Sequence, residues 1–252
     1  ESSENPIEYW DINLSGTISL IKYMKKYNCK TLVFSSSASI YGLSDNKLLK
    51  ESSPINPNNP YAMTKASIEK VLNDVFNSSP KEWKIANLRY FNPIGAHETG
   101  LIGENPSSIP NNLFPYICKV ACGQLEKLNI FGNDWNTPDG TCIRDYIHVV
   151  DLAEAHSETV VHLLRNEPNF LSLNIGTGKG TSVLELVKTF MKVNKCEIPF
   201  VFTERRKGDV PSVVADNNLA LKTLDWMPKR GLVDMCRDGW QWQQKNPNGF
   251  KP

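Results

Sequence analysis

The sequence lacks the features of a membrane protein. It contains no run of about 18 apolar residues, which is the length a membrane-spanning helix needs. It also contains no segment with the pattern of a secretory signal. We therefore expect no membrane partner.

The sequence also has no excess of charge of either sign. Its 28 Lys and Arg residues against 27 Asp and Glu residues leave a formal net charge of +1. Proteins that hold nucleic acid through their charge carry a strongly basic surface. The balance of charges gives no electrostatic argument for nucleic acid, and we expect none as a partner.

Cysteine is sparse and is not arranged as a site. The six cysteines include no CxxC pair, and no Cys and His residues stand at zinc-binding spacing. Scattered thiols without a disulfide framework are typical of a reducing compartment. We expect a cytoplasmic protein without a metal site.

An α/β pattern is present in the first part of the chain. Residues 31–34 and 84–90 are apolar and β-branched, and they predict buried strands. Between them, Asn58 or Asn59 can cap a helix that has Pro60 at its first position. Polar residues follow both strands, and ligands bind at the carboxyl ends of parallel strands. The alternation predicts an α/β fold around a parallel sheet.

Tyr61 and Lys65 stand four residues apart on the predicted helix, so both side chains share one face. A Tyr hydroxyl titrates near pH 10, and it is a poor base at neutral pH unless its pKa is lowered. An ammonium group one turn away favours the phenolate. The same spacing also occurs in ordinary surface helices, so the pair alone is weak evidence for catalysis.

Several longer motifs accompany this pair. They are SSSASIYG at 35–42, PYAMTK at 60–65, LRYFNPIGAH at 88–97, IPNNL at 109–113, a long segment at 130–156 from IFGNDW to LAEAH, and RRKGDVP at 205–211. With these motifs the sequence resembles the extended short-chain dehydrogenase/reductase superfamily. Within it, the sequence is most similar to the UDP-glucose 4-epimerases, over nearly the whole chain.

The resemblance implies an NAD-dependent isomerase of galactose metabolism that inverts C4 of a UDP-sugar. It implies that Tyr61 takes the proton of the sugar 4-hydroxyl and that Ser37 hydrogen-bonds the same oxygen. It further implies that Lys65 holds the nicotinamide ribose and lowers the pKa of Tyr61. These three residues are the expected catalytic group.

The resemblance also implies two sets of binding residues. The expected cofactor contacts are Asn13, Ser35, Ser36, Ser37, Tyr61, Lys65, Tyr90 and Phe91. The expected substrate contacts are Ser37, Tyr61, Asn92, Asn112, Leu113, Asn129, Phe131, Arg144, Arg206 and Asp209. The guanidinium groups of Arg144 and Arg206 suit the diphosphate because they bind phosphate oxygens bidentately.

The expected architecture is a Rossmann-like parallel sheet that lacks its first βα units, together with a smaller α/β substrate domain. We expect the NAD-binding domain at 1–92 and 145–176, and the UDP-sugar-binding domain at 93–144 and 177–252. No GxxGxxG motif with a following acidic residue precedes the helix predicted at 8–27. That motif binds the pyrophosphate of a dinucleotide, so we expect the chain alone to bind NAD poorly and to be nearly inactive.

Alternatives to the epimerase interpretation remain. A non-catalytic sugar-nucleotide-binding remnant would fit the missing motif. Another NAD-dependent sugar-nucleotide epimerase or dehydratase would share the fold, but 4,6-dehydratases carry an Asp-Glu pair in the serine-rich segment, where this chain reads Ser37-Ala38-Ser39 and has no acid. The small Val213 could admit N-acetylated sugars to the pocket. A homodimer is expected for the full-length protein, as is common in the family.

Some segments invite functional interpretations that we do not favour. Residues 176–182 are Gly-rich, but they match no phosphate-binding motif and predict only a turn between a strand and a helix. His148 and His156 lack a third metal ligand, and we expect them to be structural. We expect Asp151 to cap a helix, and 92–141 to be loop-rich with one helix at 115–123.

Overall fold

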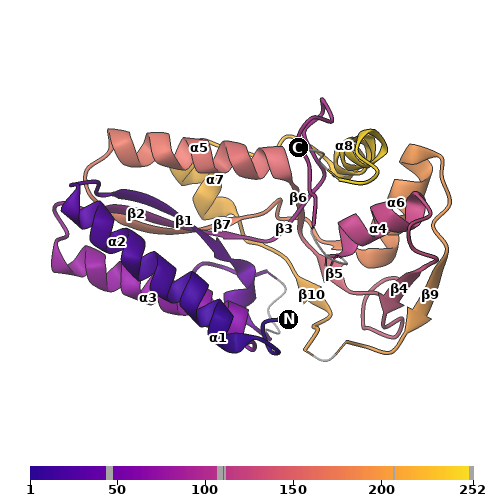
Figure 1. Cartoon of the computed structure of the whole chain (residues 1–252), viewed down its shortest axis with the longest axis horizontal. Helices are drawn as coiled ribbons and strands as arrows, with labels where there is room; N and C mark the ends of the chain where they lie inside the picture. Colours follow the sequence, from indigo (N-terminus) through magenta and orange to yellow (C-terminus); the bar gives the residue numbers. More distant parts are fainter. Residues whose placement is uncertain (44–47, 107–109, 111, 207, 250–252) are drawn as a thin grey trace. The chain divides into compact units, whose positions relative to one another are not determined.

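The chain folds into two units of mixed helix and strand in the computed structural model (Figure 1). The structure describes residues 1–43, 48–106, 110, 112–206 and 208–249. No helix in these ranges is long and apolar enough to span a membrane. Unit 1 consists of Glu1–Phe91, Glu154–Ile175 and Ala215–Met227, and unit 2 of Asn92–Ala153, Gly176–Val214 and Pro228–Pro252.

A parallel sheet forms the centre of unit 1. Its strands are β1 (Thr31–Ser37), β2 (Lys84–Tyr90) and β7 (Phe170–Ile175), in the order β1-β2-β7. Strands of a parallel sheet that helices cover on both faces are rich in apolar residues. In β2, Ile85, Ala86 and Leu88 are fully buried. The strands predicted at 31–34 and 84–90 are confirmed, and β1 continues through the serines.

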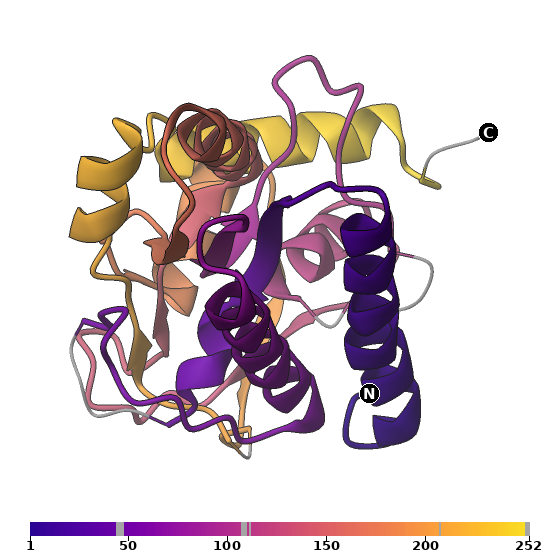
Figure 2. The ribbon, with the colours of Figure 1, turned by 90° about the vertical axis from the view of Figure 1, so that its left-hand side faces the viewer.

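The N-terminal helical run of unit 1 has three segments. They are α1 (Pro6–Tyr9), a π-helix η1 (Trp10–Ser15) and α2 (Gly16–Lys26), and they follow one another as a single column (Figure 2). This confirms the helix predicted at 8–27, with a start two residues earlier. A π-helical turn within a helix is uncommon and often marks a functional position.

Helix α3 (Pro60–Ser78) packs on the sheet through its apolar stripe. Ile68 and Leu72 are fully buried and form one core cluster with Ile85 of β2 and Ile21 of α2. The side chain of Asn59 caps the helix by accepting a hydrogen bond of 2.9 Å from the Ala62 N–H. The helix starts as the sequence predicted.

The remaining helices of unit 1 follow later strands. Helix α7 (Asn218–Leu224) packs against β7. Helix α5 (Val149–Arg165) belongs to unit 1 from Glu154 onward. It begins earlier than expected, and His148 rather than Asp151 caps it, because His148 Nδ1 accepts the Val150 N–H at 3.1 Å.

Unit 2 contains two short parallel strand pairs. They are β3 (Asn92–Ile94) with β6 (Tyr146–His148), and β4 (Leu128–Phe131) with β9 (Phe200–Thr203). The expectation that 92–141 would be loop-rich missed β3 and β4. Each is only three or four residues long, which leaves little periodicity to detect.

A third sheet and three helices complete unit 2. The sheet has the order β10-β5-β8, from Ser212–Val213, Ile143–Arg144 and Thr181–Ser182. The helices are α4 (Leu113–Ala121), α6 (Val183–Asn194) and α8 (Leu232–Lys245). Their buried side chains, which include Ile117, Leu186, Phe190 and Cys236, form one core cluster with Ile130 of β4.

The two units differ from the expected domains in two segments. Residues 145–153 lie in unit 2, where β6 pairs with β3. Residues 215–227 lie in unit 1, where α7 packs on β7 and Ala215 bridges to Leu49. Each segment belongs to the unit that contains its strand or bridge partner, rather than to the unit expected from its neighbours in the sequence.

Candidate active site

Ser37 ends strand β1 in unit 1. Its hydroxyl oxygen accepts hydrogen bonds from the Ser39 N–H at 3.2 Å and from the Ser39 hydroxyl at 2.9 Å. These bonds cap the 3-10 helix η2 (Ala38–Tyr41). The strand therefore delivers Ser37 to the carboxyl end of the sheet and the cap holds its side chain there.

Tyr61 lies in the first turn of α3 and hydrogen-bonds Ser37. Burial raises the pKa of Tyr61, and the bond with Ser37 opposes this shift. Charge on Tyr90 and Tyr9 would raise the pKa further. The ring of Tyr9 meets the Tyr61 ring edge-on, with the centroids 6.3 Å apart. Burial is thus the largest influence on the pKa of the Tyr61 hydroxyl, and the contact with Ser37 acts against it.

Lys65 lies one turn after Tyr61, as the spacing predicted. Its ammonium donates to the Ser35 carbonyl at 3.0 Å and lies 5.7 Å from the centroid of the Tyr61 ring. Burial lowers the pKa of Lys65. Burial is the largest cause of the Tyr61 shift and raises its pKa, so the expected lowering by Lys65 remains a prediction.

The other serines of β1 point to opposite faces, because side chains alternate along a strand. The Ser35 hydroxyl lies 3.1 Å from His156 Nε2 of α5. The Ser36 hydroxyl is buried and donates to Glu69 of α3 at 2.5 Å. The expected cofactor contact at Ser36 can therefore involve only its backbone.

The remaining expected cofactor residues are also in unit 1. Asn13 lies in the π-helix η1, and its amide donates to the Thr64 hydroxyl at 3.0 Å. The ring centroids of Tyr90 and His156 are 6.1 Å apart. Phe91 is 6% exposed, which makes it a core residue rather than an open contact.

In unit 2, Arg144 and Asp209 come together, as expected for a shared site. Arg144 Nη2 lies 3.4 Å from Asp209 Oδ1, and Nη1 donates to the carbonyls of Ile143 and Val210 at 2.8 and 2.9 Å. Val213 pairs in register with Arg144 between β10 and β5. The guanidinium of Arg144 is thus held by its own unit and is only partly open to a ligand.

Arg206 lies over the ring of Phe131, with its guanidinium carbon 4.4 Å from the centroid. Phe131 ends β4 and is 36% exposed. The stack places a cation beside an aromatic face at the end of the β4–β9 pair. A flat base and a phosphate group could both be held by such a combination.

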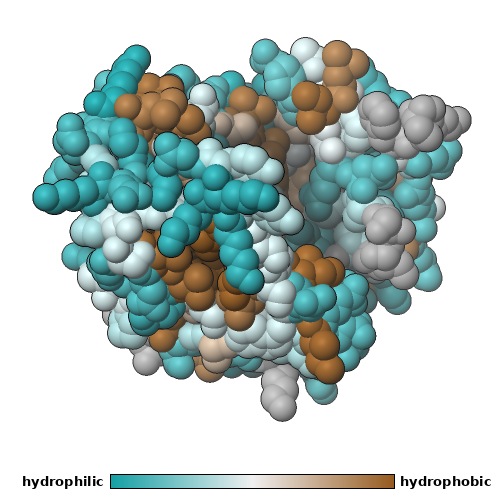
Figure 3. All heavy atoms as spheres, turned by 60° about the vertical axis from the view of Figure 1, so that its left-hand side comes forward, coloured by the Kyte–Doolittle hydropathy of each residue, from teal (hydrophilic) through white to brown (hydrophobic). Residues whose placement is uncertain are grey.

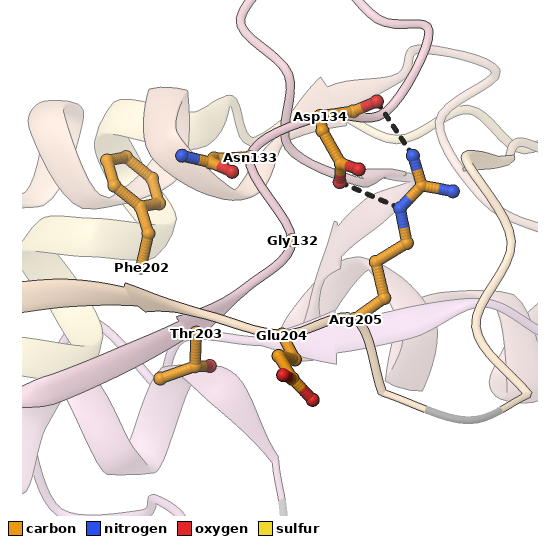
Figure 4. A pocket seen from close by; sticks show the side chains of 7 residues that line it. All are labelled: Gly132, Asn133, Asp134, Phe202, Thr203, Glu204 and Arg205. Atoms are coloured by element: carbon orange, nitrogen blue, oxygen red, sulfur yellow. Dashed lines mark hydrogen bonds and ion pairs between the residues drawn. The ribbon is translucent and has the colours of Figure 1, made fainter.

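A hollow of about 640 Å³ opens beside this end of the pair (Figure 4). Figure 4 shows the side chain of Arg205 reaching to Asp134, where it donates to the carboxylate and to the carbonyl at 2.7 Å each. Arg205 also stacks on Trp135. The residues that line the hollow are Gly132, Asn133, Asp134, Phe202, Thr203, Glu204 and Arg205.

The other expected substrate residues have structural partners in unit 2. The side chain of Asn112 hydrogen-bonds Glu104, and Leu113 packs against the core cluster. The Asn92 N–H donates to the Asp145 carbonyl, while Asn129 is exposed on β4. Two further members of the expected binding motifs, Asn111 and Lys207, lie outside the described residues.

The Gly-rich segment after β7 is a turn, and backbone N–H groups of this turn donate hydrogen bonds to Asp145. One carboxylate oxygen of Asp145 accepts the N–H and hydroxyl of Thr177 at 2.8 and 2.6 Å, and the other accepts the Gly178 N–H at 3.0 Å. A buried carboxylate from the same unit takes the place that an anionic ligand would need. The prediction of a structural turn is consistent with these bonds.

Across the residues that the structure describes, no group of three or more His, Cys, Asp or Glu side chains could hold a metal ion. His148 is buried, and its Nε2 lies 3.3 Å from Asp238 Oδ2. Since Nδ1 accepts from Val150, the proton belongs on Nε2. Burial lowers the pKa of His148, so it is a neutral structural residue near pH 7.

Comparisons with known proteins agree with this geometry. A family profile described as GDP-mannose 4,6 dehydratase matches residues 1–239. A UDP-glucose 4-epimerase of Bacillus subtilis (strain 168) is 49% identical over 251 residues, which is 100% of this chain and 74% of the relative. The chain belongs to the UDP-glucose 4-epimerase family. That family lies within the extended short-chain dehydrogenase/reductases.

Solved structures place this epimerase-family chain in the same fold. The UDP-glucose 4-epimerase of Bifidobacterium longum, in complex with NAD+ and UDP, matches with a TM-score of 0.93 and 46% identity, over 99% of this chain and 74% of that one. The enzyme of Stenotrophomonas maltophila, with bound NAD and formylated UDP-arabinopyranose, matches with a TM-score of 0.94 and 44% identity, over 97% and 72%. The Rossmann-like α/β fold is thereby confirmed.

Sequence reasoning missed three residues of this epimerase-family site. Thr64 holds Asn13, Asp145 holds the Gly-rich turn, and Glu69 anchors Ser36. Only Glu69 carried a detectable signal, because it stands four residues after Lys65 on the same helix face. The partners of Thr64 and Asp145 are more than 30 residues away in the sequence, and only folding reveals them.

Proposed function

We propose that this protein interconverts UDP-glucose and UDP-galactose by oxidation and re-reduction at sugar C4, with NAD as cofactor. The observation that carries the proposal is the grouping of Tyr61 and Lys65 on one face of α3, with the Lys65 ammonium bonded to the Ser35 carbonyl beside Ser37 at the end of β1. These groups meet at the carboxyl end of a parallel sheet, where such folds bind ligands. Membership of the epimerase family supports the choice of reaction.

The donors of unit 1 fit the ribose of a nicotinamide cofactor. Lys65 carries three N–H donors on a half-buried ammonium, one of which reaches the Ser35 carbonyl. Lys65 would hold the ribose hydroxyls, and Tyr90 would line the same region. The cofactor supplies a hydride acceptor and donor.

The chain's own residues manage the proton of the sugar 4-hydroxyl. Ser37 and Tyr61 both present hydroxyls at the same point, so either can accept or donate a hydrogen bond to the reacting oxygen. When the C–H bond at C4 breaks, Tyr61 removes the hydroxyl proton, and a 4-keto sugar forms. When hydride returns to the opposite face, Tyr61 gives the proton back.

Unit 2 supplies groups for the nucleotide of the substrate. Arg206 stacked on Phe131 presents a guanidinium and an aromatic face, and Arg144 with Asp209 offers a second polar pair. We propose that the first combination binds the diphosphate and neighbouring nucleotide, and that Asp209 binds the ribose.

A sugar-nucleotide dehydratase is a weaker candidate. Elimination of water needs an acid in the segment after β1, and that place holds Ala38, which is 7% exposed, and the capping partner Ser39. No side chain in these two positions could protonate a leaving hydroxyl.

We also propose a homodimer in the cytoplasm. The helical run at the N-terminus exposes large apolar side chains, including Ile7, Ile12, Leu20 and Tyr23 at 51–82%. Figure 3 shows apolar patches between polar side chains on the face it draws. All six cysteines have free thiols, as suits a reducing compartment. Sedimentation of the full-length protein, with Leu20→Glu as the disrupting variant, tests the dimer.

The test of the function is Tyr61→Phe in the full-length protein. Loss of general acid–base catalysis should lower kcat for UDP-galactose by about 10²–10⁴-fold, and UDP affinity should stay within a few-fold. Tyr27→Phe is the matched control, because Tyr27 is 71% exposed. Turnover within a few-fold of the unmutated protein would exclude Tyr61 as the base. No epimerisation by the unmutated protein would refute the proposed function.

A further inference from the structure

A third residue continues the face of α3 that carries the catalytic pair. Glu69 follows Tyr61 and Lys65 at the same spacing of four residues, and the three side chains therefore line one face of the helix. Glu69 is only 5% exposed. A carboxylate is rarely so buried unless it is paired, and its partners lie on the strands that end at the site.

Arg89, near the end of β2, binds Glu69 through two nitrogens. Its Nε donates to Oε1 at 2.9 Å, and its Nη2 donates to Oε2 at 2.6 Å. Ser36 of β1 donates to Oε1 at 2.5 Å. The carboxylate therefore ties α3 to both strands at once, with Arg89 4% exposed and Ser36 fully buried.

A second layer holds Arg89 itself. Its Nη1 donates to the Tyr41 hydroxyl at 3.1 Å and to the Glu51 carbonyl at 2.9 Å. The Tyr41 hydroxyl in turn donates to the side-chain oxygen of Asn174 on β7 at 2.6 Å. The network thus reaches every strand of the β1-β2-β7 sheet and the end of η2, the short helix that Ser37 caps.

The members of this network are the immediate neighbours of the catalytic groups. Ser36 precedes Ser37, Arg89 precedes Tyr90, and Glu69 lies two turns after Tyr61. We propose that the buried Glu69–Arg89 ion pair is a positioning device, which sets α3 against β1 so that Tyr61 and Ser37 meet. This inference rests on the proposed function and adds two positioning residues to it.

The geometry of the pair suits this task better than apolar packing would. A bidentate guanidinium–carboxylate contact fixes direction as well as distance. Apolar contacts between α3 and the sheet, such as those of Ile68 and Leu72, are non-directional and tolerate small shifts along the helix axis. A buried ion pair is also often no more stabilising than apolar residues of the same size, so stability alone does not account for it.

The test compares Glu69→Gln and Arg89→Lys in the full-length protein. Glu69→Gln removes the negative charge of the carboxylate. Arg89→Lys keeps the positive charge but loses the bidentate contact of the guanidinium. Misplacement of a catalytic group can cost up to about 100-fold in rate. We expect kcat for UDP-galactose to fall by about 10- to 100-fold in both variants, with the KM within threefold.

The pH profile of kcat separates positioning from two other roles. Loss of the Ser37–Tyr61 bond should raise the Tyr61 pKa, because that bond lowers it. In both variants, the limb of the pH profile of kcat that reports the ionisation of Tyr61 should then shift to higher pH. A direct charge effect would instead lower the pKa in Glu69→Gln, since a nearby negative charge is lost. A merely structural role would lower the melting temperature without moving the limb.

Two further variants guard against ambiguous results. Ser36→Ala leaves the ion pair in place and should shift the Tyr61 limb to higher pH by a smaller amount. This variant provides the test if Glu69→Gln and Arg89→Lys do not fold. Asp151→Asn removes the charge of a buried carboxylate that pairs with the partly exposed Arg230 in unit 2, so it should lower stability and leave the limb unmoved. An unmoved limb in every folded variant of the network would overturn the proposal.

The proposed function and this inference fail in different ways. If the unmutated protein epimerises UDP-galactose and Tyr61→Phe abolishes turnover, the proposed function stands. An unmoved limb in Glu69→Gln and Arg89→Lys would then refute only the positioning role.

Discussion

Two arginine–carboxylate pairs, one in each unit, have very different surroundings. In unit 1, Arg89 and Glu69 are each 5% exposed at their side chains, and their closest atoms are 2.6 Å apart. In unit 2, the side chains of Arg144 and Asp209 are 17% and 29% exposed, with their closest atoms 3.4 Å apart. The first pair is closed to solvent and the second is partly open.

The difference indicates two kinds of task. A closed, bidentate pair holds one geometry, because each alternative leaves a buried charge without a partner. An open pair with a single long contact can exchange that contact for a ligand at little cost in free energy. We therefore propose that the arginine–carboxylate pair of unit 1 fixes one geometry, and that the pair of unit 2 exchanges its contact for a ligand.

Breaking the closed pair should give the largest loss of stability. Arg89→Met leaves the Glu69 carboxylate buried without its guanidinium, which costs about 3–5 kcal/mol in comparable pairs. Denaturant unfolding measures this loss. The double variant Arg89→Met with Glu69→Met should recover much of it, since no buried charge remains. A loss below about 1 kcal/mol, typical of exposed pairs, would contradict the contrast between the units.

Removing the stacked arginine of unit 2 should mainly affect ligand binding. Arg206→Ala should weaken UDP affinity by roughly 1.5–3 kcal/mol, the value of a charge-assisted hydrogen bond. Calorimetric titration with UDP measures the change. Arg205→Ala is the matched control, because Arg205 is already paired with Asp134. Unchanged UDP affinity in Arg206→Ala would make Arg206 an ordinary surface residue.

Breaking the open pair should give the smallest effect on stability. Asp209→Asn removes a single contact of 3.4 Å between partly exposed groups, so the free energy of unfolding should change by less than about 1 kcal/mol. The variant should fold normally and bind UDP more weakly if Asp209 holds the ribose. A stability loss as large as that of Arg89→Met would show that the two pairs are equivalent.

Sequence patterns predicted several elements of the fold correctly. The predicted strand 84–90 has the bounds observed for β2, and the helix predicted to begin at Pro60 starts there as α3. These segments have strong periodicity or lie between clear breaking residues. Short strands such as β3 and β4 carried too few residues for a pattern, and they were missed.

The placement of Tyr61 and Lys65 on one helix face was also predictable, but their surroundings were not. The four-residue spacing of Tyr61 and Lys65 follows from helical periodicity, and the structure keeps them on one turn. The pKa of Tyr61 is raised by burial, which depends on the elements that pack around the ring, and the lowering expected from Lys65 remains a prediction. Ser36 was expected at the cofactor and instead turns toward Glu69.

The sequence by itself determined the family, the helix that carries Tyr61 and Lys65, and the apolar strand that begins at Thr31. Those features depend on residues within a few positions of one another, where local sterics and hydrogen bonding decide the conformation. Only the tertiary structure decided that Arg89 closes on Glu69, that Asp145 fills the Gly-rich turn, and that Arg144 is shared between two carbonyls and Asp209. The bond of Arg144 to the Ile143 carbonyl joins neighbouring residues. Each of the other contacts joins residues 20 or more positions apart. Burial and strand register bring those residues together only when the sheet has formed.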